Sequence, residues 1–202
     1  MTRAEAERLL GLAREADLVG PDAARWVARL APERERLVKA ARFLAEHGEE
    51  QAAVELAANV WRLWLLSGEV ADGRRLLSAA LDVGAGRPSR ARALALYGDG
   101  LLAFRQGAQA ESQARNEAAL EVARAVGDRE AEALALVGLS RVAFRDGDYP
   151  HVRSLAAQAR ELARNLDASA GVAPLHMLAA GTRLACSANS TQIADVGWSC
   201  AV

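Results

Sequence analysis

Arginine recurs at equivalent positions of a pattern that repeats along this chain. Gly68, Gly107 and Gly147 lie 39 and 40 residues apart, and each follows an apolar-rich run. Alignment on these glycines gives two sets of equivalent positions: Arg62, Leu101 and Arg141 in the first, and Leu66, Arg105 and Arg145 in the second. Guanidinium groups donate forked hydrogen bonds that fit carboxylate and phosphate groups. One interpretation is therefore a site for an acidic peptide or another anionic ligand.

The second interpretation of these arginines is purely structural. The chain has 25 Lys and Arg residues, of which Lys39 is the only lysine, so arginine is common along its whole length. Exposed arginines on helices usually pair with nearby Asp or Glu, and such pairs contribute little to stability. The sequence leaves both interpretations open.

No other residues have the spacing of a catalytic or metal site. His47, His151 and His176 are far apart, and no Cys or His lies near them at metal-ligand spacing. The segment Gly84–Gly86 contains a lone G-x-G that follows a predicted helix and not a strand, which favours a turn over a dinucleotide loop. The chain contains no G-x-S-x-G segment. We therefore expect no enzymatic activity, no cofactor and no metal.

The overall composition bears on partners and location. A net charge of -1 and an aromatic content of 4% argue against a nucleic-acid-binding surface. No apolar run approaches the roughly 20 residues needed to cross a bilayer, and the acidic N-terminal segment lacks a signal-peptide core. We expect a cytoplasmic protein whose two cysteines, Cys186 and Cys200, stay reduced.

The repeated pattern predicts the elements that position the arginines. Three segments align with one another: Glu55–Leu81, Leu94–Leu120 and Leu134–Arg160. Each is predicted to form two helices joined by a tight turn. Ala80, Ala119 and Ala159 recur with the same step, and a small side chain at the crossing point lets two helices approach closely. Since one unit cannot bury its apolar face alone, the stack of units must supply the core.

Several helix boundaries are predicted by local signals. Ser89 is expected to be an N-cap, and Gly107 to end its helix in the left-handed conformation. Gly127 and Asp128 are expected to end one helix and cap the next. Pro150 falls in the first turn of a predicted helix, where its missing N–H costs little.

The chain is predicted to have an all-α fold with three parts. The first is a helical lead-in over residues 1–48, with a capping box at Thr2 and Glu5 but without a glycine or alanine that matches the repeats. The repeats follow over residues 49–185, as units at about 51–84, 89–126 and 129–168 and a partial unit at 170–185. Residues 186–202 contain neither Arg nor Leu, which favours an irregular tail foreign to the repeats, such as the product of a frame change near Ala185.

The repeat step, the turn glycine and the crossing alanine resemble those of the tetratricopeptide family. In addition, residues 21–83 are similar to the segment that joins the ATPase part to the repeats in large bacterial transcription regulators of the signal-transduction ATPase class. This second resemblance is carried by Ala23-Ala24-Arg25-Trp26, Arg29-Leu30, Glu33, Leu37, Ala40-Ala41, Phe43-Leu44, Trp61-Arg62-Leu63-Trp64, Ser67-Gly68 and Gly73-Arg74-Arg75-Leu76.

The resemblance implies a right-handed α-α superhelix whose concave groove is lined by the first helix of each unit. The residues expected in this groove are Arg62, Tyr97, Leu101, Arg105, Arg141 and Arg145, with Phe104 nearby. It also implies a non-enzymatic part of a transcription regulator that binds a protein, a peptide or a small-molecule effector. The chain departs from such regulators in lacking a G-x-x-x-x-G-K-[ST] segment and a DNA-reading helix-turn-helix. The alternative is a free-standing scaffold without an effector, which forms homo-oligomers through the exposed helix expected after Ala170.

Overall fold

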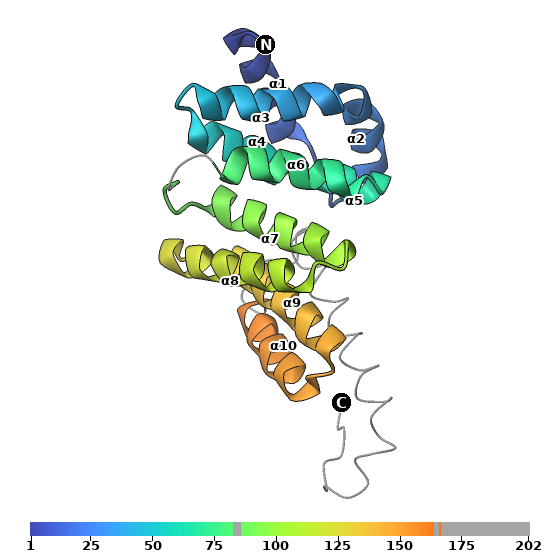
Figure 1. Ribbon diagram of the computed structural model, residues 1–202, viewed down its shortest axis with the longest axis vertical. Helices are drawn as coiled ribbons and strands as arrows, with labels where there is room; N and C mark the ends of the chain where they lie inside the picture. The colour runs from blue at the N-terminus through green and yellow to red at the C-terminus, as the bar shows by residue number, and fades with distance from the viewer. Residues whose placement is uncertain (83–85, 164–165, 167–202) are drawn as a thin grey trace, which may run out of the picture.

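A computed structural model describes residues 1–82, 86–163 and 166 of the chain, and within these residues every regular element is helical. Figure 1 shows the helices stacked one after another along the longest axis of the molecule, in nearly the order of the sequence. From α7 onwards each helix packs mainly on its neighbours in the chain, whereas α1 packs on α3 and α4. The prediction of an all-α fold is confirmed for the described residues.

The N-terminal part consists of α1 (Arg3–Glu15), α2 (Ala23–Leu30), the 3-10 turn η1 (Ala31–Glu33) and α3 (Arg34–Glu46). The predicted capping box is confirmed at the start of α1. The hydroxyl of Thr2 accepts from the backbone N–H of Glu5 at 3.2 Å, and the carboxylate of Glu5 accepts from the backbone N–H of Thr2 at 2.8 Å.

The first predicted unit comprises α4 (Glu50–Val60), α5 (Arg62–Ser67) and α6 (Val70–Leu81). The sequence predicts one continuous helix up to the turn at Gly68, whereas the structure interrupts it at Trp61. There the backbone N–H of Trp64 donates to the carbonyl of Trp61 at 3.2 Å, a tightened turn between α4 and α5. The indole of Trp61 is buried, so packing decides this break.

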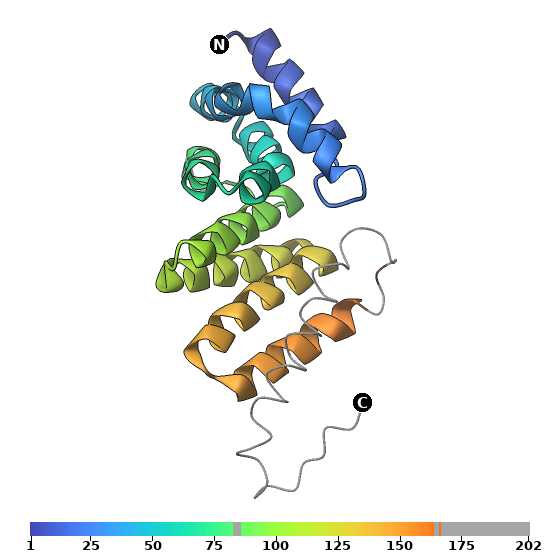
Figure 2. The same ribbon diagram turned by 90° about the vertical axis from the view of Figure 1, so that its right-hand side faces the viewer.

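The second and third units comprise α7 (Arg90–Arg105), α8 (Gln109–Val126), α9 (Arg129–Asp146) and α10 (Tyr149–Ala163). Both side-chain N-caps are confirmed, because Ser89 accepts from the N–H of Arg92 at 3.2 Å and Asp128 accepts from the N–H of Ala131 at 2.8 Å. The first helices also adjoin one another across units, with α7 packed on both α4 and α9 (Figure 2).

One glycine shows that the repeat pattern extends further towards the N-terminus than the sequence predicts. Gly48, between α3 and α4, has a φ of +78°, in the left-handed region that favours glycine. The turn glycines at 68, 107, 127 and 147 have φ values between 68° and 80°. The sequence did not indicate Gly48 as a turn glycine, because the glycines that match the repeats recur at steps of 39 and 40 residues. Gly48 lies 20 residues before Gly68, a single helix and its turn, so an alignment on whole hairpins overlooks it.

The core combines the predicted alanines with a buried ion network. Ala80 and Ala119 are fully buried and Ala159 is 1% exposed, as their positions at helix crossings predict. Asp99 on α7 is also fully buried, between Arg74 of α6 and Arg115 of α8. Asp99 lies within a run of small and apolar residues, and no motif in the sequence indicates its role.

Several predictions fall outside the described residues. These are the turn at residues 84–86 except Gly86, the partial unit at residues 170–185, the tail at residues 186–202, and the residues His176, Cys186 and Cys200. Among the helices of the described part, none is both long and apolar enough to cross a bilayer.

Candidate partner-binding face

The predicted groove residues all lie on α5, α7 and α9. Helices α7 and α9 are the first helices of the second and third units, and α5 is the last segment of the interrupted first helix of the first unit. We call this surface the α5–α7–α9 face, and it comprises Arg62, Tyr97, Leu101, Arg105, Arg141 and Arg145. Leu101 is half-buried and packs against the main core.

Arg141 and Tyr97 are brought together by the stacking of α9 on α7. Nη1 of Arg141 donates to the hydroxyl of Tyr97 at 3.2 Å. The ring of Tyr97 is 2% exposed and meets the ring of Trp61 edge-on, with 6.0 Å between the ring centroids. Trp61, Tyr97 and Arg141 thus connect the three units in one continuous contact, whose polar end lies on the face.

Arg62 lies beside the same aromatic pair. Its guanidinium carbon is 4.5 Å from the centroid of the Trp61 ring, within the range of a cation–π contact. Burial lowers the pKa of Arg62, and the nearby Tyr97 and Glu130 partly oppose this shift. An arginine remains protonated despite such a shift, so Arg62 is a partly desolvated cation.

Arg145 and Arg105 lie one helical turn further along. The guanidinium carbon of Arg145 is 3.8 Å from the centroid of the Phe104 ring, and its Nη1 donates to the carbonyl of Phe104 at 3.1 Å. Arg105 is exposed, and no contact joins it to the other residues of the face within the described part of the chain. The structure therefore assembles Arg62, Tyr97 and Arg141 as one group, and Arg145 with Phe104 as a second.

The four arginines of the face differ from arginines elsewhere in their pairing. Arg62, Arg105, Arg141 and Arg145 form no ion pair with any Asp or Glu that the structure describes. By contrast, Arg14 on α1 binds Glu55 through two hydrogen bonds of 2.8 Å. The structural interpretation of the face arginines, in which each pairs with a nearby carboxylate, does not hold at these positions among the described residues.

A pocket of about 200 Å³ opens next to Arg62. Its walls come from four parts of the chain: the connection between α1 and α2, the α4–α5 region, α7 and α9. In Figure 2 the blue connection between α1 and α2 forms a loop below these helices, on the side towards the later helices. The polar residues Asp17, Asn59 and Glu130 line this pocket together with Arg62. None of these three belongs to a motif that indicates a site in the sequence, and residue 17 lies outside the repeats.

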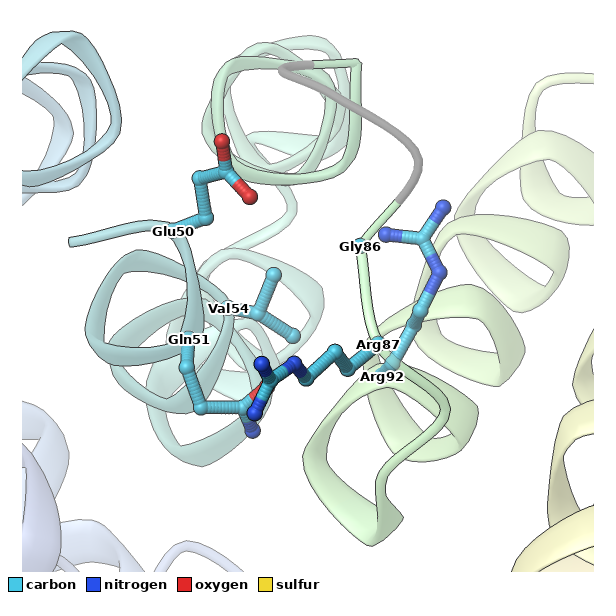
Figure 3. Close-up of a pocket in the computed structure, with 6 residues that line it drawn as sticks. All are labelled: Glu50, Gln51, Val54, Gly86, Arg87 and Arg92. Atoms are coloured by element: carbon cyan, nitrogen blue, oxygen red, sulfur yellow. The ribbon is translucent and has the colours of Figure 1, made fainter. Parts of the chain in front are cut away.

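Two further hollows lie away from this face. One is a cavity of about 50 Å³ between the start of α4 and the residues before α7, and Figure 3 shows the side chains of Arg87 and Arg92 beside Gln51 and Gly86. It has room for little more than water. The other is an open groove of about 530 Å³ bounded by α8, α9 and α10, with apolar residues such as Leu136 and Leu155 in its floor.

The histidines and acids of the described part form no group that could hold a metal ion. His47 stacks on Phe43, with 3.9 Å between the ring centroids, and its Nδ1 lies 2.8 Å from the carbonyl of Phe43. His151 is exposed near the start of α10, 3.8 Å from a carboxylate oxygen of Asp148. Both are helix-end positions, where a histidine is well solvated.

No protein-family model matches the chain, and no curated protein is similar to it in sequence. Among solved structures, the chain is similar to the crystal structure of BtubC (BKLC) from P. vanneervenii, with a TM-score of 0.56 and 15% sequence identity. The match covers 98% of this chain and 92% of that chain. At this identity the likeness concerns the helical fold alone.

Proposed function

We propose that this chain is a non-enzymatic, tetratricopeptide-like solenoid that binds an acidic peptide segment of a partner protein along the α5–α7–α9 face. The observation that carries the proposal is the set of four arginines without carboxylate partners on neighbouring first helices. A carboxylate from outside the chain would supply the missing partners, and guanidinium groups held by aromatic stacking lose little further freedom on binding it.

The superhelical form is supported by the regular recurrence of turns. Left-handed glycines follow α3, α5, α8 and α9, and Gly107 takes the same conformation between α7 and α8. Each unit contacts mainly its neighbours, which is the organisation of repeat proteins. Successive small rotations between such units generate extended binding surfaces.

A place in a bacterial transcription regulator is supported by the sequence resemblance over residues 21–83. Trp61 and Trp64, which carry part of that resemblance, are each 1% exposed and pack the first unit. In this role the chain would be an interaction or sensor part, which transmits partner binding to other domains.

A second candidate function is favoured by the open groove along α8, α9 and α10. Its apolar floor and its volume of about 530 Å³ suit a scaffold that self-associates by burying this surface against another copy. Sedimentation over a range of concentrations separates the two functions, because a peptide-binding monomer keeps a constant mass.

The peptide proposal is tested by selecting a random peptide display library on the purified chain. We expect the enriched peptides to be rich in Asp and Glu. The variant R62E/R105E/R141E should lose these peptides, because it reverses three of the four charges on the face.

The matched control is R25E/R42E/R153E, which makes the same charge change at exposed arginines of α2, α3 and α10. It should keep the binding. Enrichment of peptides without acidic residues, or equal loss of binding in both triple variants, would contradict the proposal. Circular dichroism of both variants verifies that the helices are intact.

A further inference from the structure

The pocket beside Arg62 differs from the rest of the α5–α7–α9 face in that a segment outside the three units contributes to its walls. The connection between α1 and α2 contributes Asp17, Leu18 and Val19, while α7 and α9 contribute Leu94 and Leu134 on other walls. A concave site lined by four parts of the chain suits a small molecule.

The pocket contains a cation that has no hydrogen-bonded carboxylate among the residues the structure describes. Arg90, its second arginine, is occupied, since its two Nη atoms donate to Asp128 and Glu130 at 2.6 Å each. Arg62 forms no ion pair with the described residues and stacks on Trp61 instead. The side chain of Asn59 also lines the pocket and has no hydrogen-bond partner in the described part of the chain. Both groups are therefore available to bind a carboxylate.

The pocket also contains an anion on another element. One carboxylate oxygen of Asp17 accepts from the backbone N–H groups of Gly20 at 2.8 Å and Val19 at 3.1 Å. These hydrogen bonds lower the pKa of Asp17, so its carboxylate stays ionised. Its other oxygen forms no hydrogen bond with the described part of the chain. This carboxylate would repel a simple anion. A molecule that bears a negative and a positive charge can bind Arg62 with the first and Asp17 with the second.

The remaining walls are apolar, and the volume sets an upper limit on size. Leu18, Leu94 and Leu134 supply aliphatic surface between the charged groups. A volume of about 200 Å³ lies below the roughly 300–1,000 Å³ of pockets for drug-sized ligands. It suits a single amino acid.

We propose that this pocket binds a free aliphatic α-amino acid, with its carboxylate on Arg62 and Asn59, its ammonium group towards Asp17 and its side chain against the leucines. The inference goes beyond peptide binding along the α5–α7–α9 face, since such a ligand contacts none of the other five residues of that face. Because it contacts both the α1–α2 connection and α9, the bound amino acid would stabilise the packing of the N-terminal segment against the third unit.

The test is isothermal titration of the whole 202-residue chain with leucine and two analogues that each lack one charge. The analogues are 4-methylpentanoate, without the amino group, and 3-methylbutylamine, without the carboxylate. We expect leucine to bind and each analogue to bind at least about tenfold more weakly, because each leaves one charged wall unpaired. Binding of 4-methylpentanoate as tight as that of leucine would overturn the proposal, as would the absence of heat with leucine, isoleucine, valine and alanine.

Variants assign the binding to the pocket. R62M and N59A should each weaken leucine binding, R62M by about tenfold or more. R42M makes the same change as R62M at an exposed arginine of α3 and should bind leucine like the wild type. If R62M does not fold, N59A still tests whether leucine binds in this pocket. Unchanged leucine affinity in N59A would contradict binding there. The double variant R105E/R145E separates the two proposals, since it should lose acidic peptides and keep leucine.

Discussion

Asp99 on α7 accepts a hydrogen bond from Nε of Arg74 on α6 at 3.0 Å, and none of the Asp99 side chain is exposed. On the other side, Nε of Arg115 on α8 lies 2.8 Å from the second carboxylate oxygen. Arg74 and Arg115 keep 21% and 33% of their side chains exposed, so the two cations reach solvent while the anion does not. The first unit is thereby joined to both helices of the second through one carboxylate.

Replacing Asp99 should destabilise the chain. D99N keeps the shape of the side chain but removes the charge between two guanidinium groups, and we expect a loss of about 2–3 kcal/mol in the free energy of unfolding. Urea denaturation followed by circular dichroism measures it. D72N is the matched control, because the Asp72–Arg75 pair is 46% and 74% exposed and should contribute no more than about 0.5 kcal/mol. Similar losses in the free energy of unfolding of D99N and D72N would show that burial of Asp99 does not strengthen its ion pairs.

Two glycines in helix interiors should respond oppositely to alanine. A Cβ atom on Gly98 would lie 2.8 Å from ring atoms of the buried Trp61, so G98A should cost about 1–3 kcal/mol through overpacking. A Cβ atom on Gly11 would have no neighbour within 4 Å, and G11A should stabilise α1 by up to about 1 kcal/mol through helix propensity. Thermal and urea unfolding of the two variants provide the comparison. A stabilised G98A would mean that the Trp61 ring can shift.

Glu55 should contribute to stability only above acidic pH. Its hydrogen bonds with Arg14 hold the pKa of Glu55 below its ordinary value of 4.5, and partial burial opposes this shift. Because the pKa is lower in the folded chain, the ionised pair stabilises the fold above about pH 4.5, and the stabilisation is lost as the pH falls through the lowered pKa. E55Q should therefore be less stable than the wild type at neutral pH, with a difference that disappears in acid.

The measurement for Glu55 is urea unfolding between neutral and acidic pH. E121Q makes the same change at an exposed residue of α8 without an ion pair in the described part of the chain, and its difference from the wild type should stay small throughout. A constant difference for E55Q at all pH values would assign the effect to packing.

The Tyr97 hydroxyl should be coupled to Arg141. Y97F removes the acceptor of the 3.2 Å hydrogen bond and should cost about 1 kcal/mol, while Y149F, at the half-buried first residue of α10, should change stability by less than about 0.5 kcal/mol. A double-mutant cycle with R141M isolates the pair. Additive effects of Y97F and R141M would contradict a direct interaction between these residues.

Local signals in the sequence predicted several boundaries of the helices. The capping box at Thr2, the N-caps at Ser89 and Asp128 and the left-handed Gly107 depend on residues within one turn of the chain. Hydrogen bonds between neighbours in the sequence decide such features, so residue types are sufficient to find them. The recurring glycines also indicated stacked hairpins, although the search for whole hairpins missed Gly48.

The tertiary structure alone decided which side chains meet across units. Asp99 and Gly98 follow each other in one helix, yet one is held by two arginines and the other makes room for Trp61. The pocket beside Arg62 likewise combines Asp17 from the lead-in with Leu134 from the third unit. Such contacts depend on how helices far apart in the sequence pack, and neither periodicity nor capping encodes that geometry. Residue types therefore determined the helices and their turns, while the packing of one unit on the next created the buried carboxylate and the pocket.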